Sequence, residues 1–124
     1  MLHSFKVCDR VKRIFNMIGF AQKAGKASSG SLAAKTSLLR KKAYLLIMSN
    51  DISEKTKEAL TSSCTKQKIP WIMLGNKYEL GTSVGKAYRV AVAVNDRNLA
   101  KAIMNLVKTM GAEVKSTGVV EWPK

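Results

Sequence analysis

Two short segments of the sequence combine glycine, small residues and bases in a way that suits contact with phosphate. The first, Gly30–Ser31, precedes an expected helix, and the unpaired N–H groups and positive dipole end of a helix N-terminus attract anions. Gly30 would let a phosphate or a base edge approach the backbone, and Lys26 and Lys35 would add positive charge. In the competing interpretation, Ser29 or Ser31 caps its own helix and Gly30 only turns the chain. These residues alone leave both interpretations open.

The second segment is a basic glycine junction that precedes an expected strand. It consists of Gly85, Lys86, Ala87, Tyr88 and Arg89. In an α/β sandwich such a junction could lie near the start of the second helix, and the two segments would then form one basic surface.

The sequence does not match known enzyme or metal-binding motifs, because the spacing or the residue type differs. The stretch "GTSVGKA" superficially resembles a phosphate-binding P-loop, but only three residues separate its glycines, and Ala87 stands where Ser or Thr is required. The eight acids are scattered, His3 is the single histidine, and Cys8 and Cys64 form no CxxC motif. We therefore predict no catalytic residues, no metal site and no cofactor.

The charge of the 124-residue chain is strongly positive, with 22 Lys and Arg against eight Asp and Glu and a net charge of +14. Ten of these bases, but only one acid (Asp9), lie in residues 1–42. This asymmetry favours a polyanionic partner, and a merely soluble basic surface is the alternative. No apolar run could span a bilayer, and the N-terminus lacks a signal-peptide core. We expect a cytoplasmic location, no membrane partner, a buried Cys64 and a free Cys8 thiol.

Helical and strand patterns alternate along the chain. Apolar spacing predicts a helix from Val11 to Gly25, with Gly25 as its C′ residue, then a short edge strand in "KASS". A second helix is expected from Ser31 to about Lys42, with Leu32, Leu38 and Leu39 inward or at its margins. The continuously apolar stretch Tyr44–Met48 predicts a strand buried on both faces.

The second half of the chain continues this alternation. The expected elements are a helix from the capping-box spacing Asp51–Glu54 to about Gln67, a strand Trp71–Leu74, a short helix opened by Asn76–Glu79, a strand Arg89–Val94, and a last helix capped at Asn95–Asp96. This order predicts an α/β fold, a three-layer α/β/α sandwich around a small mixed and largely parallel sheet. We expect one domain over residues 1–124, with a core at about 11–110 and a tail at 111–124 that either adds an edge strand through Val119–Val120 or stays mobile.

Three sequence blocks in this order resemble a known family. They are "GxxxSGSxxxxxxLLRKKAYLLIMSNDISEKTKEAL", "KIPWIMLGNKYELGTSVGK" and "RVAVAVND". The ordered set is similar to the kink-turn-binding ribosomal proteins, the L-seven-Ae and L-thirty-e group, and within it to the bacterial YlxQ-type branch. The resemblance covers about Ile14 to Leu106 and implies a three-layer α/β/α fold, no catalysis and binding to structured RNA.

The resemblance also implies where RNA would bind. Gly30 and Ser31 match the start of the family's recognition helix, and the loop Lys86–Arg89 matches the loop that packs on an extruded nucleotide. Tyr88 would stack there or belong to the core, and Arg89 would pair with phosphate. Together with the basic residues nearby, the predicted RNA-binding set is Lys26, Gly30, Ser31, Leu32, Ala33, Lys35, Thr36, Arg40, Lys86, Ala87, Tyr88 and Arg89.

The sequence departs from the family pattern at three positions of that helix. Leu32, Ala33 and Thr36 stand where the resemblance implies Asn, Glu and Lys, so side chains that hydrogen-bond to base edges are replaced. We predict a monomeric, non-enzymatic RNA-binding protein whose partner is structured RNA, with ribosomal RNA, a kink-turn or the ribosome as candidates. The alternative is a protein-interaction module that docks on a ribosome or ribonucleoprotein, since Leu32 and Ala33 form an apolar pair.

Overall fold

The computed structural model describes residues 2–109 and 115–116, in which helices and strands alternate as expected. The elements are α1 (Leu2–Lys23), β1 (Ala27–Ser29), α2 (Ser31–Leu39), β2 (Leu45–Met48), α3 (Glu54–Gln67), β3 (Trp71–Met73), α4 (Lys77–Ser83), β4 (Ala91–Val94), α5 (Arg97–Lys108) and β5 (Lys115–Ser116). The tail forms a two-residue edge strand at Lys115–Ser116, ahead of the position Val119–Val120 at which a strand was expected. Val119–Val120 and the Cys8 side chain lie outside the described part of the chain.

The sheet is mixed, with strand order β1-β4-β2-β3-β5. Strands β2 and β3 are parallel, whereas β1–β4, β4–β2 and β3–β5 pair antiparallel. The prediction of a largely parallel sheet was wrong, because a helix between two strands does not force parallel pairing. After β3, α4 and its following loop carry the chain to the far side of β2, and β4 then runs against β2.

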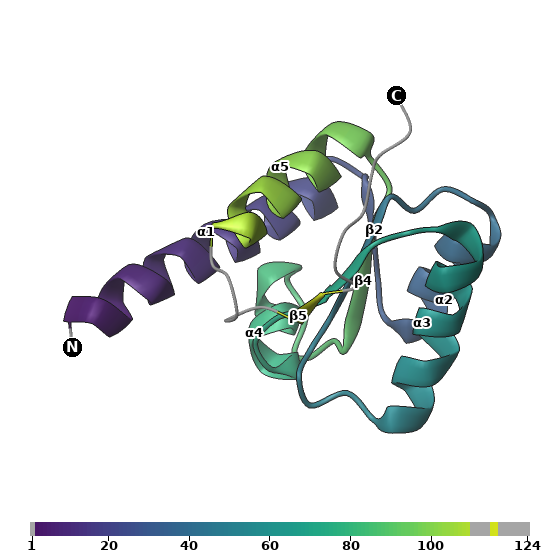
Figure 1. Cartoon of the computed structure of the whole chain (residues 1–124), viewed down its shortest axis with the longest axis horizontal. Coiled ribbons are helices and arrows are strands. Elements are labelled where there is room, and N and C mark those ends of the chain that lie inside the picture. The colour runs from purple at the N-terminus through teal and green to yellow at the C-terminus, as the bar shows by residue number, and fades with distance from the viewer. Residues whose placement is uncertain (1, 110–114, 117–124) are drawn as a thin grey trace.

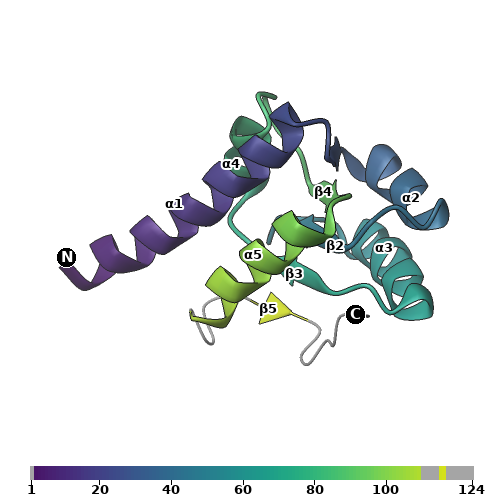
Figure 2. The same cartoon turned by 90° about the horizontal axis from the view of Figure 1, so that it is seen from above.

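Three layers are visible in Figures 1 and 2, with α1, α4 and α5 on one face of the sheet and α2 and α3 on the other. Successive residues of β4 point to opposite faces. Val92 and Val94 pack with the α1, α4 and α5 layer, and the smaller Ala91 and Ala93 pack with α2 and α3. All four are fully buried, and the three-layer α/β/α prediction is confirmed. The prediction of a strand buried on both faces is confirmed for Leu45–Met48 of β2, while Tyr44 precedes the strand and is 37% exposed.

Two helix boundaries differ from their predicted positions. Helix α1 begins at Leu2 rather than Val11, although it ends as expected ahead of Gly25. Helix α2 ends at Leu39 rather than near Lys42. Lys41 adopts a left-handed backbone (φ 58°), and the Lys42 N–H donates to the Ser37 carbonyl at 2.9 Å. This Schellman-type closure satisfies the last carbonyls of α2 and stops the helix.

Helix α2 is also rotated relative to the prediction. Leu38 is fully buried with Ala34, but Leu32 and Leu39 are 79% and 62% exposed. The inward face follows Ala34, Ser37 and Leu38, at the i, i+3, i+4 spacing of one helix face. Leu32 and Leu39 therefore lie on the outer surface.

The helix caps were predicted with one error. Asn76 with Glu79 forms the expected capping box of α4, and Asp96 caps α5. Helix α3 is capped by Ser53 instead of Asp51, because the Asp51 carboxylate accepts a hydrogen bond from the Lys77 N–H at 3.0 Å. Over the residues that the structure describes, no helix is both long and apolar enough to cross a membrane.

Candidate nucleic-acid interface

The N-terminus of α2 is open. Gly30 is its N-cap residue, with φ 107° and ψ 151°, and no side chain caps the helix. The interpretation in which Ser29 or Ser31 caps the helix is therefore wrong. The Gly30 N–H donates to the Ala91 carbonyl at 2.8 Å, and its carbonyl accepts from Ala34. The first N–H groups of α2 thus have no capping side chain, and they lie at the positive end of the helix dipole.

The second basic segment lies directly beside this helix start. A Cβ placed on Gly30 would lie 3.7 Å from the Arg89 Nε and 3.8 Å from the Arg89 Cδ. The Arg89 guanidinium donates to the Tyr88 carbonyl at 2.7 Å, which fixes its direction. The positive φ of 107° explains why glycine stands at position 30, whereas the Arg89 side chain lies at ordinary contact distance and would leave room for a Cβ. The proximity expected for the two segments is confirmed.

Strand pairing brings the two segments together. Strand β1 runs antiparallel to β4, with Ser29 opposite Val92 and Ala27 opposite Val94. The residue that leaves β1, Gly30, therefore faces the residues that enter β4. The register of β1 on β4 therefore makes neighbours of Gly30 and Arg89, which are 59 residues apart in sequence.

The loop between α4 and β4 is held against its own helix. A Cβ on Gly81 would lie 2.4 Å from the Tyr88 Cα, so only glycine allows the loop to pack this closely. The Arg89 N–H donates to the Lys77 carbonyl at 2.9 Å, and the Lys77 Nζ lies 5.8 Å from the centre of the Tyr88 ring. Tyr88 is 56% exposed, so it is a surface residue and not part of the core.

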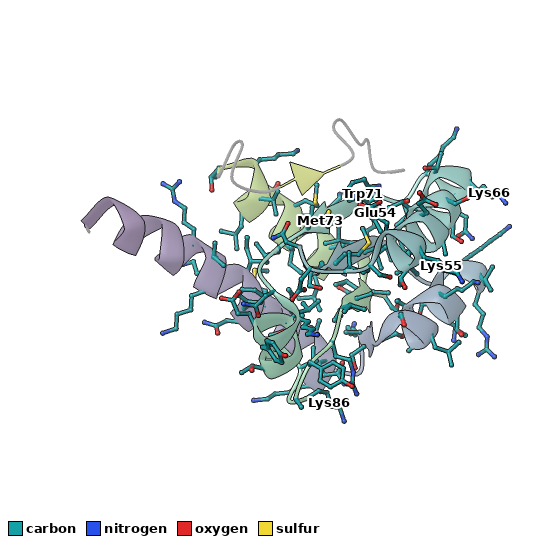
Figure 3. All side chains as sticks on the ribbon, turned by 90° about the horizontal axis from the view of Figure 1, so that it is seen from below. Glu54, Lys55, Lys66, Trp71, Met73 and Lys86 are labelled. Atoms are coloured by element: carbon teal, nitrogen blue, oxygen red, sulfur yellow. The ribbon has the colours of Figure 1, made fainter. Side chains whose placement is uncertain are left out.

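Lys86 and Ala87 form the exposed tip of this loop. Figure 3 shows Lys86 at the edge of the molecule, well separated from Lys55 and Lys66 of α3. Its charge therefore belongs to the Gly30–Arg89 side of the protein and not to the lysines of α3.

Lys26 lies at the other end of β1. Its ammonium forms an ion pair with Asp96 at 2.9 Å, and its carbonyl accepts from the Asn95 N–H. Three residues of β1 separate Lys26 from Gly30, so their Cα atoms lie roughly 13 Å apart along the strand. The structure thus does not bring Lys26 together with Gly30 and Arg89.

The remaining predicted residues follow α2 away from Gly30. Ser31, Leu32 and Lys35 are exposed, and Thr36 donates its hydroxyl to the Leu32 carbonyl at 3.0 Å. Arg40 is the C-cap residue, roughly 13 Å along the helix from its start. A hollow of about 400 Å³ runs beside this helix and is lined by Ser28, Leu32, Ala33, Thr36, Ser37, Arg40, Lys42 and Asn95.

Sequence reasoning missed Lys77 and Tyr78. The Lys77 Nζ lies 5.4 Å from the Tyr78 ring centre and 5.8 Å from that of Tyr88, so one ammonium lies near two exposed rings. A signal existed in the sequence, because Lys77–Tyr78 and Tyr88–Arg89 are both pairs of a base with an aromatic residue. Cations interleaved with aromatic rings are typical of nucleic-acid surfaces.

The structure offers little for acid–base or metal chemistry in its described part. Among those residues, no cluster of three or more His, Cys, Asp or Glu side chains could hold a metal ion. Burial in the core raises the pKa of the Cys64 thiol to about 12, so this thiol stays protonated and unreactive. Cys64 is buried, as predicted.

Comparison with known proteins identifies relatives of the whole core. Residues 12–104 match the Ribosomal protein L7Ae/L30e/S12e/Gadd45 family. The RNA-binding protein YlxQ of Bacillus subtilis is 31% identical over 93 residues, covering 75% of this chain and 93% of the relative. The large ribosomal subunit protein eL8 of Picrophilus torridus is 27% identical over 86 residues, which is 68% of each chain.

Solved structures agree on the fold. A protein of unknown function from Bacillus halodurans superposes with a TM-score of 0.73 at 26% identity, covering 77% of this chain and 96% of that one. The Giardia lamblia 15.5kD RNA binding protein gives a TM-score of 0.68 over 84% of this chain and 89% of that one, and at 18% identity this likeness shows the fold alone. On the strength of the match over residues 12–104 and the YlxQ relative, this chain belongs to the Ribosomal protein L7Ae/L30e/S12e/Gadd45 family.

Proposed function

We propose that this protein binds structured RNA without catalysing a reaction, and that it does so through the N-terminus of α2 and the loop between α4 and β4. Membership of a family with RNA-binding relatives supports the RNA partner, as does the net charge of +14. Ribosomal RNA is the RNA class that the ribosomal relative suggests, and kinked duplexes are the class that the resemblance of the sequence implies.

The observation that carries this proposal is the juxtaposition of Gly30 and Arg89. An uncapped helix start, a residue without a side chain and a guanidinium within 3.7 Å of its Cβ position together form an anion site. A phosphate received by the N–H groups of Ser31 and Leu32 would lie within reach of Arg89. Lys35 and Lys86 would neutralise neighbouring phosphates, and Tyr88 would stack on a displaced base.

Shape, rather than base identity, is the property that this surface is equipped to read. Leu32, Ala33 and Thr36 occupy the outer first turns of α2, and Leu32 presents an apolar side chain that is 79% exposed. None of the three offers the bidentate groups that distinguish bases. The backbone N–H groups and the Arg89 guanidinium remain, and they recognise the path of the phosphates.

A second candidate function is docking to a protein of a ribosome or ribonucleoprotein particle. The observation in its favour is the outer face of α2, where Leu32 is 79% and Leu39 62% exposed. Apolar side chains at such positions suit a protein partner. In this version, RNA contact would be secondary.

Titration with two RNAs tests the primary proposal. A kink-turn RNA and an unkinked duplex of equal length are bound at two salt concentrations, with fluorescence anisotropy as the measurement. We expect tighter binding to the kinked RNA and a steep loss of affinity with salt for both. Equal affinities would contradict shape recognition. Absence of binding to either RNA near physiological salt, with co-sedimentation on ribosomes that Leu32→Ser abolishes, would establish the protein-docking alternative.

A further inference from the structure

A groove between α1 and α4 opens beside the proposed RNA site. It has a volume of about 1020 Å³, and its walls include Phe15 and Phe20 of α1 and Tyr78 of α4. The two helices approach closely at its floor, where a Cβ on Gly19 would lie 2.6 Å from the Ser83 carbonyl oxygen. Figure 2 shows α4 beside the C-terminal half of α1, on the side from which the chain continues to β4.

Three exposed aromatic rings run from the RNA site into this groove. Phe20 is 61%, Tyr78 59% and Tyr88 56% exposed. Tyr88 adjoins Arg89, and Lys77 lies near the rings of both Tyr88 and Tyr78. Tyr78 in turn lines the groove with Phe20. Lys77 thus links Tyr88 to Tyr78, and Tyr78 shares the groove with Phe20.

The charge around the groove is positive. Lys12 and Lys23 lie at its rim, both exposed. Among the described residues that line the groove, the one acid is Glu79, and its carboxylate accepts the Asn76 N–H at 2.9 Å within the capping box. The groove thus combines apolar ring faces with exposed lysines.

We propose that this groove binds an unpaired RNA segment that continues from the structured RNA at Gly30 and Arg89. Bases stack on Tyr88, Tyr78 and Phe20 in turn, while Lys77, Lys12 and Lys23 neutralise the phosphates between them. This inference rests on the proposed function, because the segment reaches the groove from the RNA held there. An aromatic track with interleaved cations fits a flat, anionic and flexible chain better than it fits a protein helix, whose apolar stripe needs no cations.

Three versions of one RNA test the groove. A kink-turn hairpin is prepared without a tail, with a tail of six adenosines, and with a tail of six abasic nucleotides, attached in turn at each end of the strand. We expect the adenosine tail at one end to tighten binding about tenfold, since each stacked base contributes to affinity. The abasic tail has the same phosphates but no bases, so it should give only a small part of that gain in affinity.

Variants locate the gain in the groove. Phe20→Ala should remove most of the adenosine-tail gain and leave the affinity for the tail-free hairpin within about twofold. Tyr78→Ala should also remove most of that gain. Tyr78→Phe keeps the ring and should keep the gain. Tyr44→Ala, at an exposed ring of residue 44 outside the groove lining, is the matched control and should have no effect.

The outcomes separate this inference from the proposed function. Suppose that the tail-free hairpin binds and that Arg89→Ala weakens this binding. If the adenosine and abasic tails then add no affinity, or add the same affinity, the groove inference is wrong and the proposed function stands. If no RNA binds, both are wrong. If Phe20→Ala instead dissociates a dimer in sedimentation, the groove holds a second copy of this chain and the RNA track is wrong.

Discussion

A helix N-terminus lies at each end of strand β1, and the two differ in whether a carboxylate of the protein neutralises them. At one end, Asp96 caps α5 by accepting the Leu99 N–H at 2.9 Å, and the same carboxylate pairs with Lys26 at 2.9 Å. At the other end, α2 begins at Gly30 with no side-chain cap, and Arg89 lies alongside with no carboxylate partner among its described contacts. The first end is neutralised within the protein, and the second is open to an external anion.

This contrast shows why the number of basic residues is a poor guide to the site. Lys26 and Arg89 both belong to a chain of net charge +14, yet one cation is used for folding and the other is available. What distinguishes them is the presence of an acid within hydrogen-bond distance. To pair with a phosphate, Lys26 would first have to give up its hydrogen bond to Asp96.

The largest expected effect comes from Arg89. Arg89→Ala should weaken binding to a kink-turn RNA about tenfold, because it removes the guanidinium beside the open helix start. Lys26→Ala should change the affinity by no more than about twofold, since Asp96 already neutralises Lys26. Fluorescence anisotropy of both variants on the same RNA measures the difference. Equal losses would show that the two ends of β1 do not differ in function.

A smaller effect is expected from Lys86. Lys86→Ala should reduce the slope of log affinity against log salt by about one ion, because one phosphate contact is lost. Lys108→Ala, at the end of α5, carries the same charge change and should leave the slope unchanged. If both variants lower the slope equally, the protein attracts RNA by diffuse charge and has no defined site.

The C-terminal end of α2 offers a test that separates stability from binding. Lys41 has φ 58°, a conformation that glycine adopts without strain. The free energy of unfolding of Lys41→Gly should therefore exceed that of Lys41→Ala by about 1 kcal/mol. The two variants lose the same charge and should bind RNA equally. Urea denaturation measures the first quantity and anisotropy the second. A higher stability for the alanine variant would contradict the left-handed closure of α2.

The smallest effect is expected at the Lys26 end of β1, where Asp96 pairs with Lys26. The Leu99 N–H and then the Lys26 ammonium lower the pKa of the Asp96 carboxyl, so its ionised form stabilises the fold above the ordinary carboxyl pKa. Asp96→Asn should therefore lower the melting temperature slightly at neutral pH. The difference in melting temperature between Asp96→Asn and the original protein should vanish as the pH falls through the lowered pKa of Asp96, because the protonated carboxyl no longer stabilises the fold. A difference that is constant with pH would show that the charge is irrelevant.

Much of the fold was predictable because its signals are local. The buried runs that became β2 and β4, the capping box of α4 and the Asp96 cap all depend on residues close in sequence. Strand direction and the rotation of α2 were not predictable in this way. They depend on packing between distant segments, and the outward position of Leu32 follows from the burial of Ala34 and Leu38 on the sheet.

The candidate site was predictable only in its parts. The sequence indicated Gly30–Ser31 and the loop ending at Arg89, but the register of β1 on β4 makes them neighbours. The same register places Lys26 beside Asp96, which a list of bases could not reveal. Lys77 was missed because its position near two rings arises from the fold of the α4–β4 loop against Gly81.

Chemical-shift mapping by NMR tests the central claim most directly. A ¹⁵N-labelled sample is titrated with the kink-turn RNA, and every backbone amide is followed at once. The account predicts the largest shifts at residues 30–33 and 85–89, with small shifts at Lys26, Asp96 and the helix that Asp96 caps. Largest shifts at the Lys26–Asp96 end of β1, or shifts spread evenly over all exposed lysines, would contradict it.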